Sequence, residues 1–381
     1  MSKKRRLFLI AGEVSGDTHG AALMRALPES KFELDGLGGP QMAKLAQNLE
    51  DWLDEAAVLG LWEVLRKYGY FREKMDETAN RIAKDRPDAV VLIDYPGFNL
   101  RLAKRLRGEG YTGKLIYYIS PQVWAWKKGR IKTMAELLDL MICIFPFEKP
   151  LYENSGLKTV FSGHPLVDSL ARLKLDAAVR EPDLVALLPG SREREVEALF
   201  PVMAEAAVRL KQRHPEMRFA ASAVSEKLAA RMHEIASEVR LHPSCLDIGV
   251  GNVHDVMQRA SVGVVASGTA TLEAAYFGLP YCLVYKVACL TYVVGRAVVS
   301  IDYLGIVNVI ADREVVKELL QGDANGEKIA DELDRLFSDE AARETLQAEL
   351  AEVVNRLGEG GAHENAANAI ERKDRSRSLR P

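Results

Sequence analysis

Short runs of apolar residues alternate with longer amphipathic segments along most of the chain. Because these runs are apolar at every position, they predict strands that are buried on both faces of parallel sheets. The amphipathic segments between the runs predict the helices that cover those faces. The predicted strands are residues 6–11, 88–93, 114–119, 140–145, 184–189, 218–223 and 262–267. The predicted helices are residues 20–27, 71–84, 98–107, 193–213 and 225–239.

The alternation stops at residues 165–183, a polar stretch with a proline near each end, and then begins again. A chain of 381 residues exceeds one ordinary domain, so the interruption predicts a domain boundary. We therefore expect two Rossmann-like, doubly wound α/β domains, residues 1–164 and 184–350, joined by a linker at 165–183. Residues 351–381 are expected to form a C-terminal helix and a basic tail.

The composition is that of a soluble globular protein, with 48% hydrophobic and 28% charged residues. A net charge of −3 gives no reason to expect nucleic-acid binding. No segment approaches the roughly 20 apolar residues of a membrane span, and the first apolar run is too short for a signal peptide. The four cysteines show no paired spacing. They predict reduced core residues in a cytoplasmic protein, without a disulfide or zinc framework.

Four strand-to-helix junctions carry the candidate chemistry, because ligands bind beyond the carboxyl ends of the strands in such sheets. The first junction, "LIAGEVSGDTHGAAL", is rich in glycine. Its spacing is G-x-x-x-G-x-x-x-G and not the G-x-G-x-x-G of dinucleotide-binding loops, which argues against an NAD site. A tight turn with close helix–sheet packing explains the glycines. Ser15 or Asp17 is expected to cap the following helix.

The second and third junctions each place a charged side chain after a buried strand. Asp94, in "LIDYPGFNL", either organises the turn or serves as a general base. In "LLPGSREREVEAL", Ser191 can cap the helix, and Glu193 and Glu195 suit its first turn. Arg192 does not suit it, because a cation is disfavoured there unless an anion neutralises it. This mismatch predicts that Arg192 binds phosphate.

The fourth junction, "ASGTATLEAAYFGLP", begins a helix with small residues. Ser267 and Thr269 are both N-cap candidates, and nothing bulky near Gly268 blocks close approach to the backbone. Exposed N–H groups at a helix N-terminus favour an anion. Glu273 either follows the helix dipole or, beside a bound diphosphate, accepts from the hydroxyls of a ribose. Together with Arg192, these residues predict one nucleoside-diphosphate site in the second domain.

A set of segments between residues 7 and 321 carries a resemblance to a known enzyme family. The segments are "AGEVSGD", "GLGGPQM", "IDYPGFN", "SPQVWAW", "FPFE", "GHPL", "LLPGSRERE", "ASGTATLEAA" and "NVIADREVVKELLQ". In this order they resemble the lipid-A-disaccharide synthase family, and "SPQVWAW" with "ASGTATLEA" is the most specific part. The resemblance implies a metal-independent, inverting glycosyltransferase of the GT-B type, whose two Rossmann-like domains face a cleft.

The resemblance also implies the reaction and its place. The family transfers 2,3-diacylglucosamine from UDP-2,3-diacylglucosamine to the 6-hydroxyl of 2,3-diacylglucosamine 1-phosphate, in Gram-negative bacteria. The products are the β-1′,6-linked lipid A disaccharide 1-phosphate and UDP. Residues 1–164 are then expected to bind the acceptor and lipid, and residues 184–350 the UDP-sugar, without a cofactor. A cytoplasmic enzyme attached peripherally to the inner-membrane surface is expected, and some family members form homodimers through C-terminal segments.

The sequence itself agrees with metal-independent chemistry, since it has no Asp-x-Asp motif and no His/Cys cluster. Residue by residue, Asp94 matches the proposed catalytic base of the family, and Arg192, Glu273 and Asn308 match its nucleotide site. The rest of the expected substrate-binding set is Glu13, Ser15, Ser191, Ser267, Gly268 and Thr269. Gly97 departs from the family, which often has a second aspartate there. Around Asn308, "IVNVIADRE" replaces the usual "LPNLLAGRE".

Residues 58–72, "VLGLWEVLRKYGYFR", carry apolar and aromatic side chains on more than one narrow helical stripe, with cations between them. Core packing is one explanation of this pattern. The other, which the resemblance favours, is a membrane-facing patch, because aromatics suit the headgroup region and cations attract anionic lipid. The residues assigned to this patch are Trp62, Leu65, Tyr68 and Phe71.

Two other functions stay open on the residues alone. A related GT-B enzyme that transfers another UDP-sugar, or epimerises one, would share the nucleotide site but not the lipid contacts. A Rossmann oxidoreductase is disfavoured by the missing G-x-G-x-x-G fingerprint.

Overall fold

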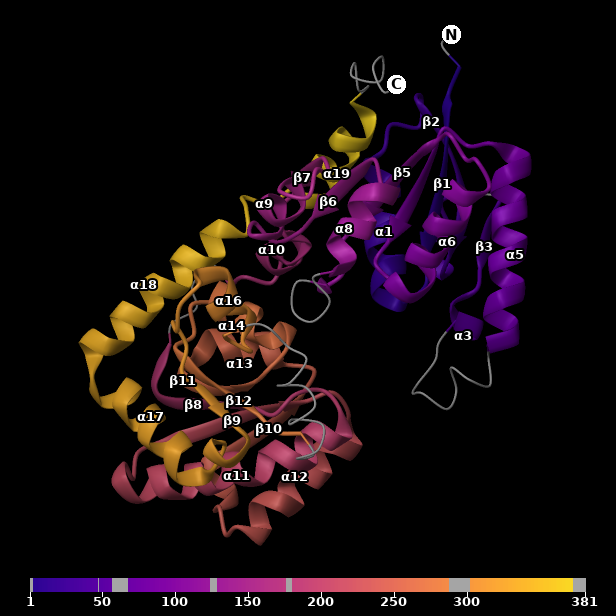
Figure 1. Cartoon of the computed structure of the whole chain (residues 1–381). Helices are drawn as coiled ribbons and strands as arrows, with labels where there is room; N and C mark the ends of the chain where they lie inside the picture. The colour runs from indigo at the N-terminus through magenta and orange to yellow at the C-terminus, as the bar shows by residue number, and fades with distance from the viewer. Residues whose placement is uncertain are drawn as a thin grey trace. The chain divides into compact units, whose positions relative to one another are not determined.

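The structure is a computed structural model that describes residues 3–46, 48–56, 68–123, 129–175, 180–287 and 302–372. The chain forms two compact units (Figure 1). The first unit comprises Met1–Pro165 together with Gly358–Pro381, and the second comprises Leu166–Leu357.

The described residues of the first unit form one seven-stranded parallel sheet with helices between its strands. The strands are β1 (Arg5–Ala11), β2 (Phe32–Gly38), β3 (Leu49–Asp51), β4 (Ala89–Ile93), β5 (Lys114–Tyr118), β6 (Leu140–Cys143) and β7 (Thr159–Phe161). The helices are α1 (Val14–Ala26), α2 (Pro40–Ala43), α3 (Leu53–Ala56), α5 (Tyr68–Asp85), α6 (Pro96–Gly108), α8 (Gly129–Leu137), α9 (Glu148–Glu153) and α19 (Ala362–Glu371). The strand order is β3-β2-β1-β4-β5-β6-β7.

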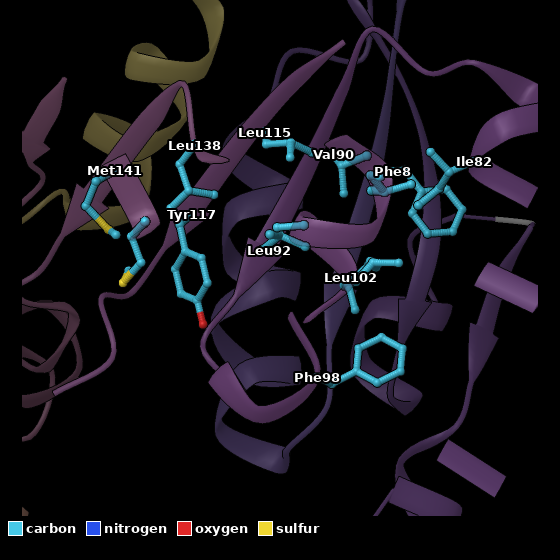
Figure 2. Packing of buried hydrophobic residues seen from close by; sticks show 14 of the residues in the cluster. Phe8, Ile82, Val90, Leu92, Phe98, Leu102, Leu115, Tyr117, Leu138 and Met141 are labelled. Atoms are coloured by element: carbon cyan, nitrogen blue, oxygen red, sulfur yellow. The ribbon is translucent and has the colours of Figure 1, made fainter. Parts of the chain in front are cut away.

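The core of the first unit lies between this sheet and its helices (Figure 2). Every residue of β4 is buried, as expected for a strand that helices cover on both faces. Phe8, Val90 and Leu92 of the sheet belong to one buried cluster with Phe98 and Leu102 of α6. Burial of each such side chain contributes roughly 1.5–3 kcal/mol. This packing fixes the end of β4, and therefore the position of the turn that follows it.

The described residues of the second unit form a six-stranded parallel sheet. Its strands are β8 (Glu181–Leu188), β9 (Arg218–Ala223), β10 (Leu246–Val250), β11 (Ala260–Ala266), β12 (Tyr281–Tyr285) and β13 (Glu318–Leu320). Its helices are α11 (Glu193–Arg213), α12 (Glu226–Glu238), α13 (Val253–Arg259), α14 (Thr269–Tyr276), α16 (Ile306–Ala311), α17 (Gly326–Ser338) and α18 (Glu340–Arg356), with 3-10 turns at Pro243–Cys245 and Gln321–Asp323. The strand order is β10-β9-β8-β11-β12-β13.

The doubly wound α/β class predicted from the sequence is confirmed, since every predicted strand and helix corresponds to an observed one. The bounds of α11 and β9 are as predicted, and the other elements differ at one or both ends. The prediction missed some strands. In β2, Glu33 and Asp35 interrupt the apolar residues, and β3, β7 and β13 have only three residues each. These strands therefore leave no continuous apolar run in the sequence. β10 and β12 were also missed.

The segments expected to lie outside the domains have structure of their own. Residues 165–183 include the short helix α10 (Pro165–Ala171) and the first residues of β8. Residues 351–381 are expected to lie apart from both domains, whereas the residues from Gly358 onward belong to the first unit. There α19 packs against α1 (Figure 1). The Arg5 guanidinium donates to the carbonyls of Ile370 and Glu371 at 3.3 and 3.0 Å.

Candidate functional site

The four junctions singled out from the sequence flank two topological switch points. In the first unit β1 and β4 are neighbours, and the chain leaves them toward opposite edges of the sheet. In the second unit β8 and β11 are neighbours in the same way. Ligands of open α/β sheets bind at such points, outside the carboxyl ends of the strands. Topology therefore pairs the glycine-rich turn with Asp94, and it pairs the Arg192 turn with the Gly268 turn.

The turn after β4 holds Asp94 in an unusual backbone conformation. Asp94 has a φ of 45°, and Tyr95 follows with a φ of 47° and a ψ of 56°. Left-handed residues other than glycine cost on the order of 1–3 kcal/mol each, so surrounding contacts must hold them. The Asp94 N–H donates to the carbonyl of Tyr118 at 3.0 Å. Its carbonyl accepts from the Tyr117 hydroxyl at 2.5 Å and the Asn99 amide at 2.7 Å.

The side chain of Asp94 is half-buried, and its carboxyl has a pKa close to neutral pH. Its pKa is raised to about 6, first by burial and second by the negative charge of Glu13. The backbone N–H of Tyr95 opposes the shift by hydrogen bonding to the carboxyl. A base whose pKa lies near the working pH combines adequate basicity with the deprotonated state.

The glycine-rich turn after β1 accommodates the ring of Tyr95. A Cβ at Gly12 would lie 2.2 Å from Cδ1 of Tyr95, so only glycine leaves room for this ring. Trp52 packs edge-on against Tyr95 with ring centroids 6.0 Å apart. Its indole N–H donates to the carbonyl of Ala11 at 2.7 Å. The two turns of the switch point therefore form one packed structure. Glu13 and Ser15 are exposed on it.

The predicted cap of the first helix is wrong. The N-cap residue of α1 is Glu13, and no side chain caps the helix. Asp17 is buried and faces α2 instead, because its carboxylate accepts from backbone N–H groups at the start of that helix. The donors are Gly39 at 2.9 Å, Gln41 at 3.0 Å and Met42 at 2.9 Å. Asp17 thus fixes α2 on α1, and Ser15 has no capping role.

The turn after β8 corrects the argument made for Arg192. Arg192 is itself the N-cap residue, Ser191 does not cap α11, and Glu195 supplies the missing anion. Glu195 accepts from the backbone N–H groups of Ser191 and Arg192 at 3.0 and 3.1 Å. It also pairs with the Arg192 guanidinium at 3.0 Å. A cation at this helix end therefore needs no external anion. The Arg192 side chain is 69% exposed and stands at the switch point.

The helix after β11 begins differently from the prediction. Its N-cap residue is Gly268, not Ser267 or Thr269, and no side chain caps it. Gly268 has a φ of 147°, which side-chain-bearing residues rarely adopt, and a Cβ there would meet nothing within 4 Å. Gly268 and Thr269 are exposed, and Ser267 is half-buried. The backbone at the start of α14 is therefore open to a ligand.

Glu273, one turn into α14, faces His254 of α13. Oε2 of Glu273 lies 3.5 Å from Nε2 of His254, and the Glu273 side chain is 22% exposed. The imidazole also packs against Phe277 with ring centroids 5.7 Å apart. Sequence reasoning missed His254, because a lone histidine on a short helix carries no distinguishing pattern.

Asn308, expected at the nucleotide site, has no side-chain polar atom left for a ligand. The side chain is fully buried in α16. Its Oδ1 accepts from the N–H groups of Val315 and Val316 at 2.8 and 2.9 Å. Its Nδ2 donates to the carbonyl of Val316 and to Glu318, each at 2.8 Å. Direct contact of this side chain with a nucleotide is therefore excluded in this conformation, and the side chain instead holds the segment that leads into β13.

The expected membrane patch is only partly within the described residues. Trp62 and Leu65 lie outside them, as does the side chain of Tyr68. Phe71 is partly buried and packs against the core cluster of the first unit, which fits the alternative of core packing at that position. Among the helices of the described residues, none is long and apolar enough to cross a bilayer.

In the described part of the chain, no group of three or more His, Cys, Asp or Glu side chains is placed to hold a metal ion. Cys143, Cys245 and Cys282 are free and buried, as predicted for core residues. Cys289 lies outside the described residues.

Residues 7–371 match the protein family described as Lipid-A-disaccharide synthetase. Curated relatives named lipid-A-disaccharide synthase align over almost the whole chain. The relative from Geobacter sulfurreducens is 40% identical, with 96% of each chain covered. The relative from Myxococcus xanthus is 38% identical and covers 97% of this chain and 98% of its own.

Solved structures of low sequence identity share the fold. UDP-GlcNAc 2-epimerase from Neisseria meningitidis, bound to UDP-GlcNAc, has a TM-score of 0.59 at 11% identity, covering 97% of this chain and 99% of its own. MurG from Acinetobacter baumannii has a TM-score of 0.57 at 14% identity, with the same coverage. With the two parallel sheets, these likenesses establish the GT-B fold.

Proposed function

Because this chain belongs to the lipid-A-disaccharide synthetase family, we propose that it is the glycosyltransferase that forms the lipid A disaccharide. The donor is UDP-2,3-diacylglucosamine, and the acceptor is 2,3-diacylglucosamine 1-phosphate. The products are the β-1′,6-linked disaccharide 1-phosphate and UDP. The observation that carries this proposal is the family match over residues 7–371.

The chemical step is an inverting displacement in which Asp94 is the base. The acceptor 6-hydroxyl gives its proton to the Asp94 carboxylate as its oxygen attacks the anomeric carbon of the donor. The bond from that carbon to the UDP oxygen breaks, and its electron pair leaves with UDP. The raised pKa of Asp94, about 6, supports this role, because the carboxylate is then both mostly deprotonated at neutral pH and basic. The rigid hydrogen bonding of its backbone supports it as well.

The departing UDP gains negative charge, and the second unit offers groups to stabilise it. The open backbone of Gly268 and Thr269 at the start of α14 supplies donors and the positive end of a helix dipole. The exposed Arg192 guanidinium adds a charge-assisted hydrogen bond, and Ser191 and Ser267 stand in the same two turns. Glu273 accepts from the hydroxyls of the donor ribose.

Other residues act through position. Asn308 shapes the β13 segment by its four hydrogen bonds. Glu13 tunes Asp94 through its charge and, with Ser15, lies exposed beside it for contact with the acceptor sugar. We place the acceptor with the first unit and the UDP-sugar with the second.

The location follows from the substrates. Acyl chains of donor and acceptor lie in a membrane, so a cytoplasmic enzyme must attach to the inner-membrane surface to reach them. The segment 58–72 is the proposed contact, through Trp62, Leu65 and Tyr68. Phe71 is left out because it packs on the core. A homodimer remains part of the proposal by analogy with the family.

The direct test incubates the purified chain with both substrates and scores the disaccharide 1-phosphate by mass spectrometry. Disaccharide with stoichiometric UDP is the expected result. A second function has a specific observation in its favour, namely the shared fold with UDP-GlcNAc 2-epimerases. Proton NMR of UDP-GlcNAc mixed with the chain tests it. Inversion at C2 without disaccharide formation would replace the proposed function with epimerisation.

A further inference from the structure

The imidazole of His254 lies beside the Glu273 carboxylate, with an unpartnered nitrogen close to it. Nε2 of His254 is buried and makes no hydrogen bond within the part of the chain that the structure describes. Its nearest charged neighbour is Oε2 of Glu273, at 3.5 Å. A buried nitrogen without a hydrogen-bond partner lowers the stability of the fold. The Glu273 carboxylate is the neighbouring group that can satisfy Nε2 of His254.

The backbone carbonyl and the ring of His254 make further contacts in the second unit. Its carbonyl accepts from the Gln258 amide at 3.1 Å, within α13. Its ring lies against Phe277, which follows the last residue of α14. The imidazole therefore packs between the two helices, and it cannot turn away from Glu273 without losing its contact with Phe277.

Glu273 itself has little else to fix it. No other ion pair or hydrogen bond to its carboxylate is found in the described ranges, and the side chain is only 22% exposed. A glutamate has several rotamers, and a carboxylate must be held in one of them to accept from two adjacent hydroxyls. Ligand binding therefore costs side-chain entropy at Glu273, and a group that already orients the carboxylate reduces that cost.

We propose that His254 is a positioning residue, which holds Glu273 in the orientation that accepts from the ribose hydroxyls of the donor. This inference rests on the proposed function, since it assumes that Glu273 meets the ribose. His254 does not touch the nucleotide in this scheme. It donates from Nε2 to Oε2, so that Oε1 and the second lone pair of Oε2 face the ligand.

The test compares binding of UDP, 2′-deoxy-UDP and 3′-deoxy-UDP to the full chain by calorimetry. The ratio of dissociation constants, deoxy over normal, measures how well Glu273 engages a hydroxyl. In the unmodified chain we expect a ratio on the order of 10 to 100 for at least one deoxy ligand, as for hydrogen bonds to charged groups. Glu273→Gln should reduce that ratio to about 1–3.

The His254 variants separate positioning from packing. His254→Phe keeps the ring against Phe277 but removes the donor, so the ratio should fall toward that of Glu273→Gln. His254→Gln keeps a donor at the reach of Nε2 and should restore most of it. His254→Asn carries a donor that is too short and should not. His233→Gln, on the exposed face of α12 in the same unit, is the matched control and should keep the full ratio.

The outcomes distinguish the inference from the function beneath it. If Glu273→Gln lowers the ratio and His254→Phe leaves it high, His254 is not a positioning residue, while the ribose assignment of Glu273 survives. If the unmodified chain shows no discrimination, the ribose assignment fails and the inference is overturned with it. In steady-state kinetics the KM for the UDP-sugar should rise in His254→Phe by more than kcat falls, which a general loss of folding would not produce.

Discussion

The ring of Tyr95 lies over the backbone of Gly12, so that the turns after β1 and β4 share one packed contact. The contact joins two segments that are far apart in the sequence at the same end of the sheet. Tyr95 adopts a left-handed conformation there and is backed by Trp52. The position of Asp94, next to Tyr95, depends on this contact.

Gly12→Ala tests this dependence. A methyl group at position 12 would collide with the Tyr95 ring, whose Cδ1 lies 2.2 Å from the added atom. We expect a loss of roughly 1–3 kcal/mol in the free energy of unfolding, as for overpacked cores, together with a clear loss of turnover. Gly97→Ala is the control, because its Cβ would meet nothing within 4 Å. Denaturant unfolding and turnover on both variants make the measurement; equal stability of the two would show that the turn relaxes freely.

Asp94→Asn tests the catalytic base. The change keeps the shape of the side chain and removes its basicity, so turnover should fall roughly 10²–10⁴-fold. UDP affinity, measured by calorimetry, should stay the same, because the nucleotide is assigned to the second unit. Near-normal turnover would transfer the role to Glu13, the exposed carboxylate whose charge acts on Asp94. Asp17 is not a candidate, since its carboxylate is engaged at the start of α2.

Glu13→Gln tests the electrostatic tuning of Asp94. The base must be deprotonated, so turnover should rise with pH through about 6 and level off above it. The negative charge of Glu13 raises the pKa of Asp94, second in size to the effect of burial. Removing that charge should therefore move the acid limb of the pH profile to lower pH. Glu29→Gln removes an exposed charge beyond the other end of α1 and should leave the limb in place. An unshifted limb in Glu13→Gln would leave burial as the sole cause.

The fold, and the positions of the candidate residues at the strand ends, follow from local sequence patterns, because both depend on burial. Strand β4 is apolar at each position, and its end places Asp94 at the sheet edge, as predicted. The roles of Asp17 and Asn308 could not be predicted, because their hydrogen-bond partners lie outside the local sequence pattern. Asp17 accepts from the start of α2, which begins only at Pro40. The Asn308 side chain bonds to Val315, Val316 and Glu318.

The sequence pattern also does not reveal which charged side chains neutralise each other. The local pattern predicts that Arg192 needs an external anion, because it assigns Glu195 only to the helix dipole. In the structure the two side chains form an ion pair. The same i, i+3 spacing brings the Glu195 carboxylate to the guanidinium and to two backbone N–H groups. His254 is the reverse case, since only the packing of α13 beside α14 reveals its contact with Glu273.

Arg192→Ala tests the phosphate assignment that this pairing left open. Loss of a charge-assisted partner should weaken UDP binding by on the order of 1.5–3 kcal/mol, measured by calorimetry. The lost pair with Glu195 is exposed and should change the free energy of unfolding by at most about 1 kcal/mol. Arg213→Ala is the matched control, because it removes an exposed, paired arginine from the other end of α11. Equal UDP affinity in both variants would remove Arg192 from the site.

His19 and His164 should make the first unit sensitive to acid. The pKa of His19 is lowered to about 4, first by burial and second by His363, and that of His164 is lowered to about 4 by burial and then by His19. In the unfolded chain a histidine has a pKa of about 6.5. Between about pH 6.5 and 4 the unfolded state therefore binds more protons, so the free energy of unfolding falls as the pH falls through this window. Above it, these groups contribute no slope.

His19→Gln isolates this contribution. Asp94 acts in the opposite direction over part of the same window, since its raised pKa of about 6 lets the folded state hold a proton, so the difference between variant and unmodified chain is the quantity to measure. Nδ1 of His19 is buried and has no hydrogen-bond partner among the described residues, so glutamine loses no bond there. The free energy of unfolding is measured with denaturant at pH 7 and at pH 4.5. Between these values it should fall by on the order of 1–3 kcal/mol more in the unmodified chain than in the variant. Parallel curves would mean that His19 becomes protonated as readily in the folded chain as in the unfolded one.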